Sequence, residues 1–493
     1  MKRSLTALAV MLALLFSLLP AAAAAEPEVP LGYTPIRTQA DLELVRQNPS
    51  GKFLLMNDIV LTGTFAPLAA QETAPFTGVF DGAVHTLSGL KLEMTGSSTK
   101  VVGLFCYNAG LIRNLRLENV DIQLTLTVTE EGHRGVVGAV AGENTGSITS
   151  CFVSGTVQAS TAWHAPDVTE SRLTVSNHVG AVTGENEGTV TGCTADANVY
   201  GMTPMVLLPE NGISFIGGIA GKNSGDILYS TNLHNIGTAG EGTILGGGIA
   251  GISDGTIGNC LSNMDAPYVE VAGIVGENTG SVTRCVNAGY AWSGCGIAET
   301  NNGVLMRCYY NDTAQSGVSN GDDTAVGLSA AQLAQKGSFS GLDFDTVWQL
   351  EAGAAHPTLR PFTLAVTELT LVSGPDKENY FVGETFDPAG LVVHAVYNNG
   401  DVEAVQHYSV QGFDTSTVGT KTVVLSLAGK EVRFPITVTA APVVPEEETP
   451  PTGQKTEQTA PPTGDPNLTA GLCVLAGLSL AVFLKAKGKR NVK

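Results

Sequence analysis

The stretch that decides the fold is Gly135-Val-Val-Gly-Ala-Val-Ala-Gly-Glu-Asn-Thr-Gly-Ser-Ile-Thr-Ser-Cys151. It joins a Gly-rich apolar run to the pattern Asn-x-Gly, a small residue, Ile or Val, two residues and Cys. The pattern returns with its glycines 23 to 42 residues apart, and it has no helical period. A unit of this size cannot bury its own apolar face, so the units are expected to stack on one another.

Seven copies of the repeat share a turn in which we expect Gly to supply a positive φ and Asn to tolerate the left-handed region. Stacked Asn side chains can also hydrogen-bond from one copy to the next. The turn positions are Asn108, Gly110, Asn144, Gly146, Asn186, Gly188, Asn223, Gly225, Gly255, Asn278, Gly280, Asn301 and Gly303; Ser253 replaces Asn in one copy.

Five of the eight cysteines stand at one offset, five residues after the repeat glycine: Cys151, Cys193, Cys260, Cys285 and Cys308. Leu115 and Ser230 occupy the same offset in other copies, so the position favours a small or apolar inward residue. We predict a buried packing column, with disulfides as the alternative. The sequence has no Cys-x-x-Cys, and no metal site or cofactor is expected.

These repeats predict a right-handed parallel β-helix, a solenoid with one coil per repeat, over residues 101–311. Residues 26–100 would form an N-terminal cap and the first coils, and residues 312–362 a C-terminal cap, because an open end exposes strand edges. Short helices are expected at 38–47 and 329–335, and Trp348 is expected to plug the last coil.

The repeats resemble the GLUG motif of bacterial surface proteins with pectate-lyase-like β-helices, as in Gly-Ile-Ala-Gly-Lys-Asn-Ser-Gly-Asp-Ile over residues 218–227. Phe80-Asp-Gly82 and Gly103-Leu-Phe-Cys-Tyr-Asn-Ala-Gly110 resemble the first coils of the same architecture. GLUG motifs also occur in certain wall-anchored immunoglobulin A metalloproteases. Those enzymes need a His-Glu-x-x-His zinc site, which this sequence lacks.

Residues 363–440 have a different pattern: short runs of alternating apolar and polar residues predict strands, with a hairpin turn at Asn399-Gly400. This pattern predicts an Ig-like β-sandwich. The phrases Val382-Gly-Glu-Thr-Phe-Asp387 and Leu391-Val-Val-His-Ala-Val-Tyr397 resemble the bacterial Ig-like domains that recur in surface proteins. We expect this domain to act as a spacer.

The N-terminus predicts export. Lys2 and Arg3 precede an apolar run and then alanines, the pattern of a signal peptide over residues 1–25. We expect cleavage at Ala23-x-Ala25, before Glu26.

The C-terminus predicts an anchor at the cell surface. A disordered linker at 441–467 precedes a transmembrane helix at 468–484 and a basic cytoplasmic tail at 485–493. Pro461-Pro462-Thr463-Gly464 resembles the Gram-positive cell-wall sorting signal, with Ala460 where that family has Leu. The resemblance implies sortase and peptidoglycan as partners and Thr463–Gly464 as the scissile bond. An uncleaved membrane anchor is the alternative.

Composition narrows the range of possible functions. With 26 basic and 46 acidic residues the chain has a net charge of −20, which argues against nucleic acid as a partner. Adhesion or binding of an extracellular protein or glycan is the leading hypothesis, and we assign no catalytic residue. A surface polysaccharide lyase or glycoside hydrolase and a structural stalk are the alternatives.

The enzyme alternative would need converging carboxylates, for which Asp58, Asp81 and Asp121, with Arg113, are the candidates. Asn320 to Asp323 could hold calcium, although turn chemistry explains that run equally well. Trp163 and Trp292, in or near inserts of the repeat, are the tryptophans of interest for binding.

Overall fold

A computed structural model describes residues 29–129, 132–163, 175–202, 212–238, 243–265, 271–290, 294–400, 402–405 and 408–441. The described residues up to Ala440 belong to one compact unit. The predicted signal peptide, sorting motif, transmembrane helix and Trp292 lie outside the described residues. Within the described ranges, no helix has the length and apolar character needed to cross a membrane.

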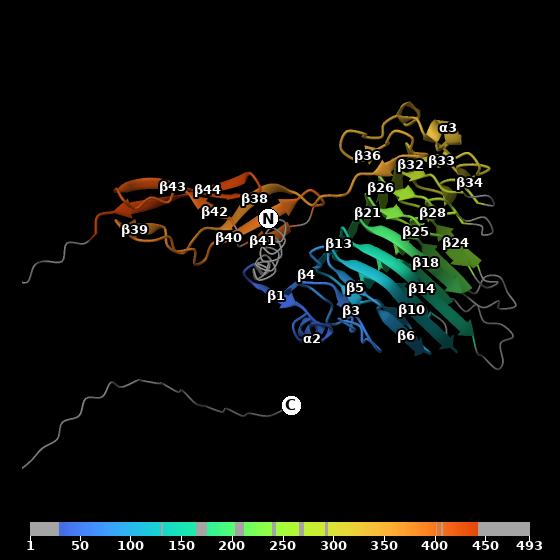
Figure 1. Ribbon diagram of the computed structural model, residues 1–493, viewed down its shortest axis with the longest axis horizontal. Coiled ribbons are helices and arrows are strands. Elements are labelled where there is room, and N and C mark those ends of the chain that lie inside the picture. The colour runs from blue at the N-terminus through green and yellow to red at the C-terminus, as the bar shows by residue number, and fades with distance from the viewer. Residues whose placement is uncertain are drawn as a thin grey trace, which may run out of the picture. The chain divides into compact units, whose positions relative to one another are not determined.

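The structure confirms a parallel β-helix followed by an Ig-like domain (Figure 1). Between β4 (Val79–Asp81) and β25 (Ala250–Ser253) each coil passes in turn through four parallel sheets, whereas the later coils have no described strand in the third of them. In the coil that begins at Leu111, for example, the chain passes through β9, β10, β11 and β12, and β13 then starts the next coil directly beside β9.

The strands of the four sheets are as follows. Sheet 1 contains β1 (Tyr33–Ile36), β2 (Lys52–Leu55), β4 (Val79–Asp81), β9 (Leu111–Arg113), β13 (Ser147–Thr149), β17 (Thr189–Thr191), β21 (Asp226–Leu228), β26 (Thr256–Gly258), β29 (Ser281–Thr283) and β32 (Val304–Met306). Sheet 2 contains β3 (Ile59–Val60), β5 (Thr86–Ser88), β6 (Lys91–Gly96), β10 (Arg116–Val128), β14 (Phe152–Trp163), β18 (Thr194–Met202), β22 (Thr231–Asn232), β23 (Ile236–Thr238), β27 (Leu261–Ser262), β30 (Val286–Asn287), β33 (Tyr309–Asn311) and β35 (Val326–Leu328). Sheet 3 contains β7 (Lys100–Val102), β11 (Arg134–Gly138), β15 (Val175–Gly180), β19 (Gly212–Gly217) and β24 (Thr243–Gly247). Sheet 4 contains β8 (Phe105–Asn108), β12 (Ala141–Asn144), β16 (Thr183–Asn186), β20 (Ala220–Asn223), β25 (Ala250–Ser253), β28 (Val275–Asn278), β31 (Ala298–Asn301) and β34 (Val318–Gly321).

The repeat asparagines form a buried ladder at the corner between sheets 4 and 1. Asn108 donates through Nδ2 to Asn144 Oδ1 at 2.7 Å, Asn144 to Asn186 at 2.7 Å, and Asn186 to Asn223 at 2.8 Å. Ser253 accepts from Asn223 at 3.0 Å. Each amide also donates to a backbone carbonyl of its own turn, so the ladder satisfies polar groups that burial would otherwise leave unpaired.

The repeat glycines work differently from the prediction, because their φ angles are not positive. A Cβ on Gly188 would lie 2.0 Å from the carbonyl oxygen of Gly146 one coil earlier, and the same clash recurs at Gly225, Gly255 and Gly280. Glycine is therefore needed because the backbones of successive coils touch there. The positive φ falls four residues later, at Asn114, Ser150, Gly192, Tyr229, Asn259, Arg284 and Arg307.

The five repeat cysteines lie in a column one residue after these left-handed positions. Cys151, Cys193, Cys260, Cys285 and Cys308 are all buried and unbonded to one another. Burial raises the pKa of the Cys151, Cys285 and Cys308 thiols well above its usual range. The thiols therefore stay protonated and pack as small apolar groups within the core.

Short helical segments flank the stack. A 3₁₀ turn at Gln39–Asp41 and α2 (Leu42–Gln47) start with a capping box between Thr38 and Asp41. At the other end, α3 (Ala330–Leu333) and a 3₁₀ turn (Lys336–Ser338) precede the pair β36 (Trp348–Gln349) and β37 (Thr358–Leu359).

Trp348 is fully buried, but it does not enter the interior column of the last coil. It packs with Leu261, Val286 and Tyr309 in a cluster separate from the main core, so this cap covers the outer face of sheet 2.

The Ig-like domain is a two-sheet sandwich. One sheet contains β38 (Val366–Ser373), β40 (Val392–Tyr397) and β41 (Val402–Val405); the other contains β39 (Asn379–Phe381), β44 (Lys430–Thr439), β43 (Gly419–Leu427) and β42 (Ser409–Gln411). The predicted hairpin joins β40 to β41, with Gly400 at φ +90°. Between the sheets lies a core that includes Tyr380, Val393, Val423 and Ile436.

We expect Asn186→Ala to destabilise the β-helix by about 2 kcal/mol, because it removes the four hydrogen bonds of the Asn186 amide, including the one that Asn144 Nδ2 donates to it. The exposed neighbour Glu187→Ala is the matched control and should change stability by less than about 0.5 kcal/mol. Urea unfolding followed by circular dichroism measures both. Equal midpoints for the two variants would show that the ladder contributes nothing.

Candidate functional site

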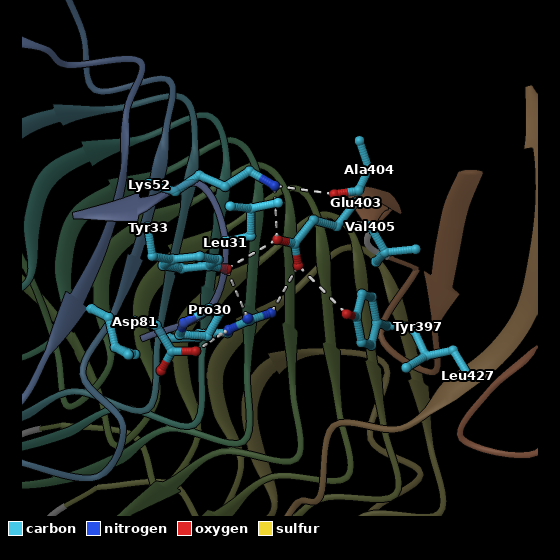
Figure 2. Close-up of a pocket in the computed structure, with 12 residues that line it drawn as sticks. Pro30, Leu31, Tyr33, Lys52, Asp81, Tyr397, Glu403, Ala404, Val405 and Leu427 are labelled. Atoms are coloured by element: carbon cyan, nitrogen blue, oxygen red, sulfur yellow. Dashed lines mark hydrogen bonds and ion pairs between the residues drawn. The ribbon is translucent and has the colours of Figure 1, made fainter. Parts of the chain in front are cut away.

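Two of the predicted candidates, Asp81 and Arg113, meet on sheet 1. They are register partners on β4 and β9, and Arg113 Nε donates to Asp81 Oδ2 at 2.7 Å. They line a pocket of about 210 Å³ whose opposite wall includes Tyr397 and Glu403 of the Ig-like domain (Figure 2). The sequence alone indicated the first pair but gave no sign of the second.

Glu403 is the centre of this pocket and accepts from four side chains. Its Oε1 accepts from the Tyr33 hydroxyl at 3.1 Å and from Lys52 Nζ at 3.4 Å. Its Oε2 accepts from Arg113 Nη1 at 3.0 Å and from the Tyr397 hydroxyl at 3.5 Å. Figure 2 shows Lys52, Tyr33 and Tyr397 converging on this carboxylate.

The environment of the pocket raises the pKa of Arg113, Tyr33 and Tyr397. Burial by itself would lower the pKa of Arg113, but the Asp81 and Glu403 carboxylates outweigh it, and the pKa is raised. Burial also raises the pKa of Tyr33 and of Tyr397. With its side chain only 10 % exposed and four donors around it, Glu403 connects the Ig-like domain to sheet 1.

The other carboxylates proposed from the sequence have separate partners. Asp58 accepts from the Thr86 backbone N–H, which lowers its pKa, and contacts His85 at 3.3 Å. Asp121 accepts from Gln123 and lies 3.6 Å from Lys91. The structure therefore does not bring Asp58, Asp81 and Asp121 together as a catalytic group.

The other candidates from the sequence are the possible calcium-binding segment and Trp163. Asp323 accepts from the backbone N–H groups of Val318 and Ala325, as a turn residue does. Across the part of the chain that the structure describes, no group of three or more His, Cys, Asp or Glu is arranged to hold a metal ion. Trp163 is the last residue of β14.

A second cluster, missed by the sequence analysis, lies between sheets 3 and 4. Glu143 and Glu185 are register partners on β12 and β16. Arg134 of β11 reaches both carboxylates: its Nη2 lies 3.0 Å from Glu143 Oε1 and its Nε 2.9 Å from Glu185 Oε1. His178 of β15 places Nδ1 at 2.8 Å from the same Glu185 oxygen. We call these four residues the corner cluster.

The corner cluster lies outside the core, and it is shielded from water unevenly: the Arg134 side chain is 42% exposed and the Glu185 side chain 11%. Val101, Cys106, Val136 and the ring of Tyr107 form a small apolar group apart from the main core, on the outer side of sheets 3 and 4. Side chains that project outward from two sheets touch only where the sheets meet at an inward angle. This shielding leaves the His178 side chain 9 % exposed.

The environment shifts the two glutamates in opposite directions. Burial raises the pKa of Glu143, although Arg134 partly offsets it. Burial also acts to raise the pKa of Glu185, but His178 and Arg134 outweigh it, and the net shift is downward. Burial raises the pKa of the adjacent Tyr107 to about 12. Divergent pKa shifts in neighbouring carboxylates are typical of functional sites.

Three buried polar atoms of the corner cluster pair with one another, because Arg134 Nε and His178 Nδ1 both lie within ion-pair distance of Glu185 Oε1. A weak sequence signal could have found this site: the residue before the repeat Asn projects outward on sheet 4. In successive coils it is Tyr107, Glu143, Glu185, Lys222, Ile252 and Glu277.

Comparison with known proteins assigns one domain. Residues 373–438 match the bacterial Ig-like domain (group 3). The fold and this match define a parallel β-helix protein that carries a bacterial Ig-like domain.

Two relatives share short segments with this chain. An exo-beta-1,6-galactobiohydrolase of Bifidobacterium longum is 33% identical over 137 residues, which cover 26% of this chain and 9% of that protein. Pectate lyase L of Thermoclostridium stercorarium is 36% identical over 76 residues, which cover 15% of this chain and 6% of that protein. The chain thus matches less than a tenth of either relative's length.

Among solved structures, a Bacteroides ovatus protein provisionally described as an immunoglobulin A1 protease is 17% identical. The match covers 67% of this chain and 92% of that one, with a TM-score of 0.37. A TM-score at that level carries no argument about function.

We expect Arg113→Met to destabilise the protein by about 3 kcal/mol, because it leaves the Asp81 and Glu403 carboxylates buried without their shared cation. Arg433→Met is the control, since its pair with Glu431 is exposed on both sides and should contribute less than about 1 kcal/mol. Urea denaturation compares the two. An Arg113→Met midpoint equal to that of the control would contradict the role given to this ion pair.

Proposed function

We propose that the protein is an exported cell-surface protein whose β-helix binds an extracellular ligand. The observation that carries this proposal is the register of the coils, which aligns outward side chains into long ordered columns. On sheet 1, the partly or fully exposed residues Thr189, Asp226, Thr256 and Ser281 are successive register partners. A rigid face with regularly spaced polar groups suits recognition of an extended or repetitive ligand.

The candidate carboxylates support binding over catalysis on sheets 1 and 2. Asp81 is paired with Arg113, and Asp58 and Asp121 stand apart with partners of their own. The one carboxylate that shares the Asp81 pocket, Glu403, is bound to the same Arg113, so neither is free to act as an acid or base on a substrate.

A second function, polysaccharide hydrolysis at the surface, is favoured by one specific observation. Glu143 and Glu185 stand on adjacent coils with their pKa values shifted apart, which is the arrangement that separates a general acid from a base or nucleophile. The partial relatives named as a galactobiohydrolase and a pectate lyase are compatible with it. The shared contact of both glutamates with Arg134 favours binding as the primary role.

A ligand panel tests the proposed function. The exported chain should bind at least one immobilised wall polymer, host glycan or matrix protein, and release no new reducing ends or unsaturated products from polysaccharides. Product release would replace binding with the enzymatic function. Absence of both binding and turnover would leave a structural stalk.

We also propose that the protein is attached to the cell wall through Thr463, on the strength of the Pro-Pro-Thr-Gly motif and the apolar and basic segments after it. Mass spectrometry of protein released by wall-degrading enzymes should find the chain ending at Thr463, joined to a wall fragment. Finding the Lys-rich tail intact on most molecules would instead indicate a retained membrane anchor.

A further inference from the structure

We propose that the corner cluster is a binding site for a neutral saccharide. This inference rests on the proposed binding function and adds the position of the site and the class of ligand. It is carried by the geometry of Arg134, Glu143, His178 and Glu185 and by the aromatic rings on either side of them.

The first argument is the partly exposed polar edge of the cluster. The Arg134 side chain is 42% exposed and the Glu143 side chain 20%, so a ligand can reach both groups without breaking the buried ion pairs that Arg134 and His178 make with Glu185. A sugar hydroxyl both donates and accepts, so a single type of group can hydrogen-bond to the guanidinium and to the carboxylate.

The second argument is the aromatic flank along the same columns. Tyr107 stands one coil before Glu143 on sheet 4, and Phe215 stands one coil after His178 on sheet 3. The Phe215 ring meets the His178 imidazole edge to face at 4.9 Å, and both aromatic residues keep part of their surface exposed. With coils about 4.8 Å apart, the two rings are three coils apart, or about 14 Å. Polar groups between two aromatic platforms suit an oligosaccharide, whose rings have apolar faces and polar edges.

The third argument is charge, which favours a neutral ligand. Glu143 and Glu185 are already compensated by Arg134, so the site offers hydrogen bonds in both directions rather than a spare cation or anion. A polyanion would meet two carboxylates and a chain of net charge −20. A basic peptide would compete with Arg134 for carboxylates that already have a cation.

The test uses the intact exported chain and titration calorimetry. The probes are neutral soluble oligosaccharides, namely β-1,4- and β-1,3-glucans, α-1,4-glucan and β-galactan, together with polygalacturonate and polylysine. At least one neutral probe should bind. Glu185→Gln and Phe215→Ala should each weaken that binding at least tenfold.

Glu277→Gln is the matched control, since Glu277 occupies the same sheet 4 column three coils after Glu185 and lies outside the cluster. It should bind as the parent does. Thermal melting of each variant separates loss of binding from loss of fold. If Glu185→Gln has a lower melting temperature than the parent, the binding of Phe215→Ala, which keeps all the charges, shows whether the site is at the corner cluster.

Two results would overturn the inference while leaving the proposed function in place. One is that Glu185→Gln and Phe215→Ala bind the neutral glycan as tightly as the parent protein does, which would place the binding site elsewhere on the β-helix. The other is binding only to polygalacturonate, polylysine or a protein ligand. No binding to any probe in this set or in the wider panel would remove the proposed function as well.

Discussion

The whole β-helix depends on the register of one coil upon the next. The repeat glycines show how strict the register is, because a single Cβ at Gly188 would lie 2.0 Å from a carbonyl oxygen of the previous coil. The Asn ladder fixes the same corner, since each side-chain amide must lie directly over its equivalent to make its bond. A slip of one residue would reverse every inward and outward side chain, so close backbone contact and buried polar bonds specify a single stacking.

The features that recur in every coil could be predicted from the sequence. The constant offsets of Asn, Gly and Cys are visible as a repeat, and they predict the stack, its ladder and its buried column. The predicted role of the repeat glycines was wrong, because a pattern of Gly and Asn looks the same whether Gly adopts a positive φ or lets the backbones of two coils touch. The structure places the positive φ four residues later, at positions that include Tyr229 and Arg284.

The sites depend on contacts that no repeat encodes. Asp81 and Arg113 could be named for their chemistry, but their partner Glu403 comes from a different domain 290 residues after Arg113. The corner cluster is hidden for a related reason. Glu143 and Glu185 stand beside the motif, whereas Arg134 and His178 come from strands whose sequences differ from coil to coil, and the angle between sheets 3 and 4 brings them together.

Each of the two arginine clusters pairs one arginine with two carboxylates, but the two clusters differ in exposure. Arg113 and its two carboxylates are surrounded by hydroxyl and ammonium donors, and the Arg113 side chain is only 13% exposed, so a ligand could gain little there. The Arg134 side chain is 42% exposed, so a ligand can reach its guanidinium.

The fold allows the residues of the corner cluster to change without affecting the register of the coils. Chain length changes between sheets 2 and 3, as between Trp163 and Val175 or Met202 and Gly212, whereas the Asn-x-Gly corner between sheets 4 and 1 keeps its length. Outward residues on sheets 3 and 4 can therefore change without disturbing the ladder that holds the register. A binding specificity at this position could be altered coil by coil while the stack itself stays the same.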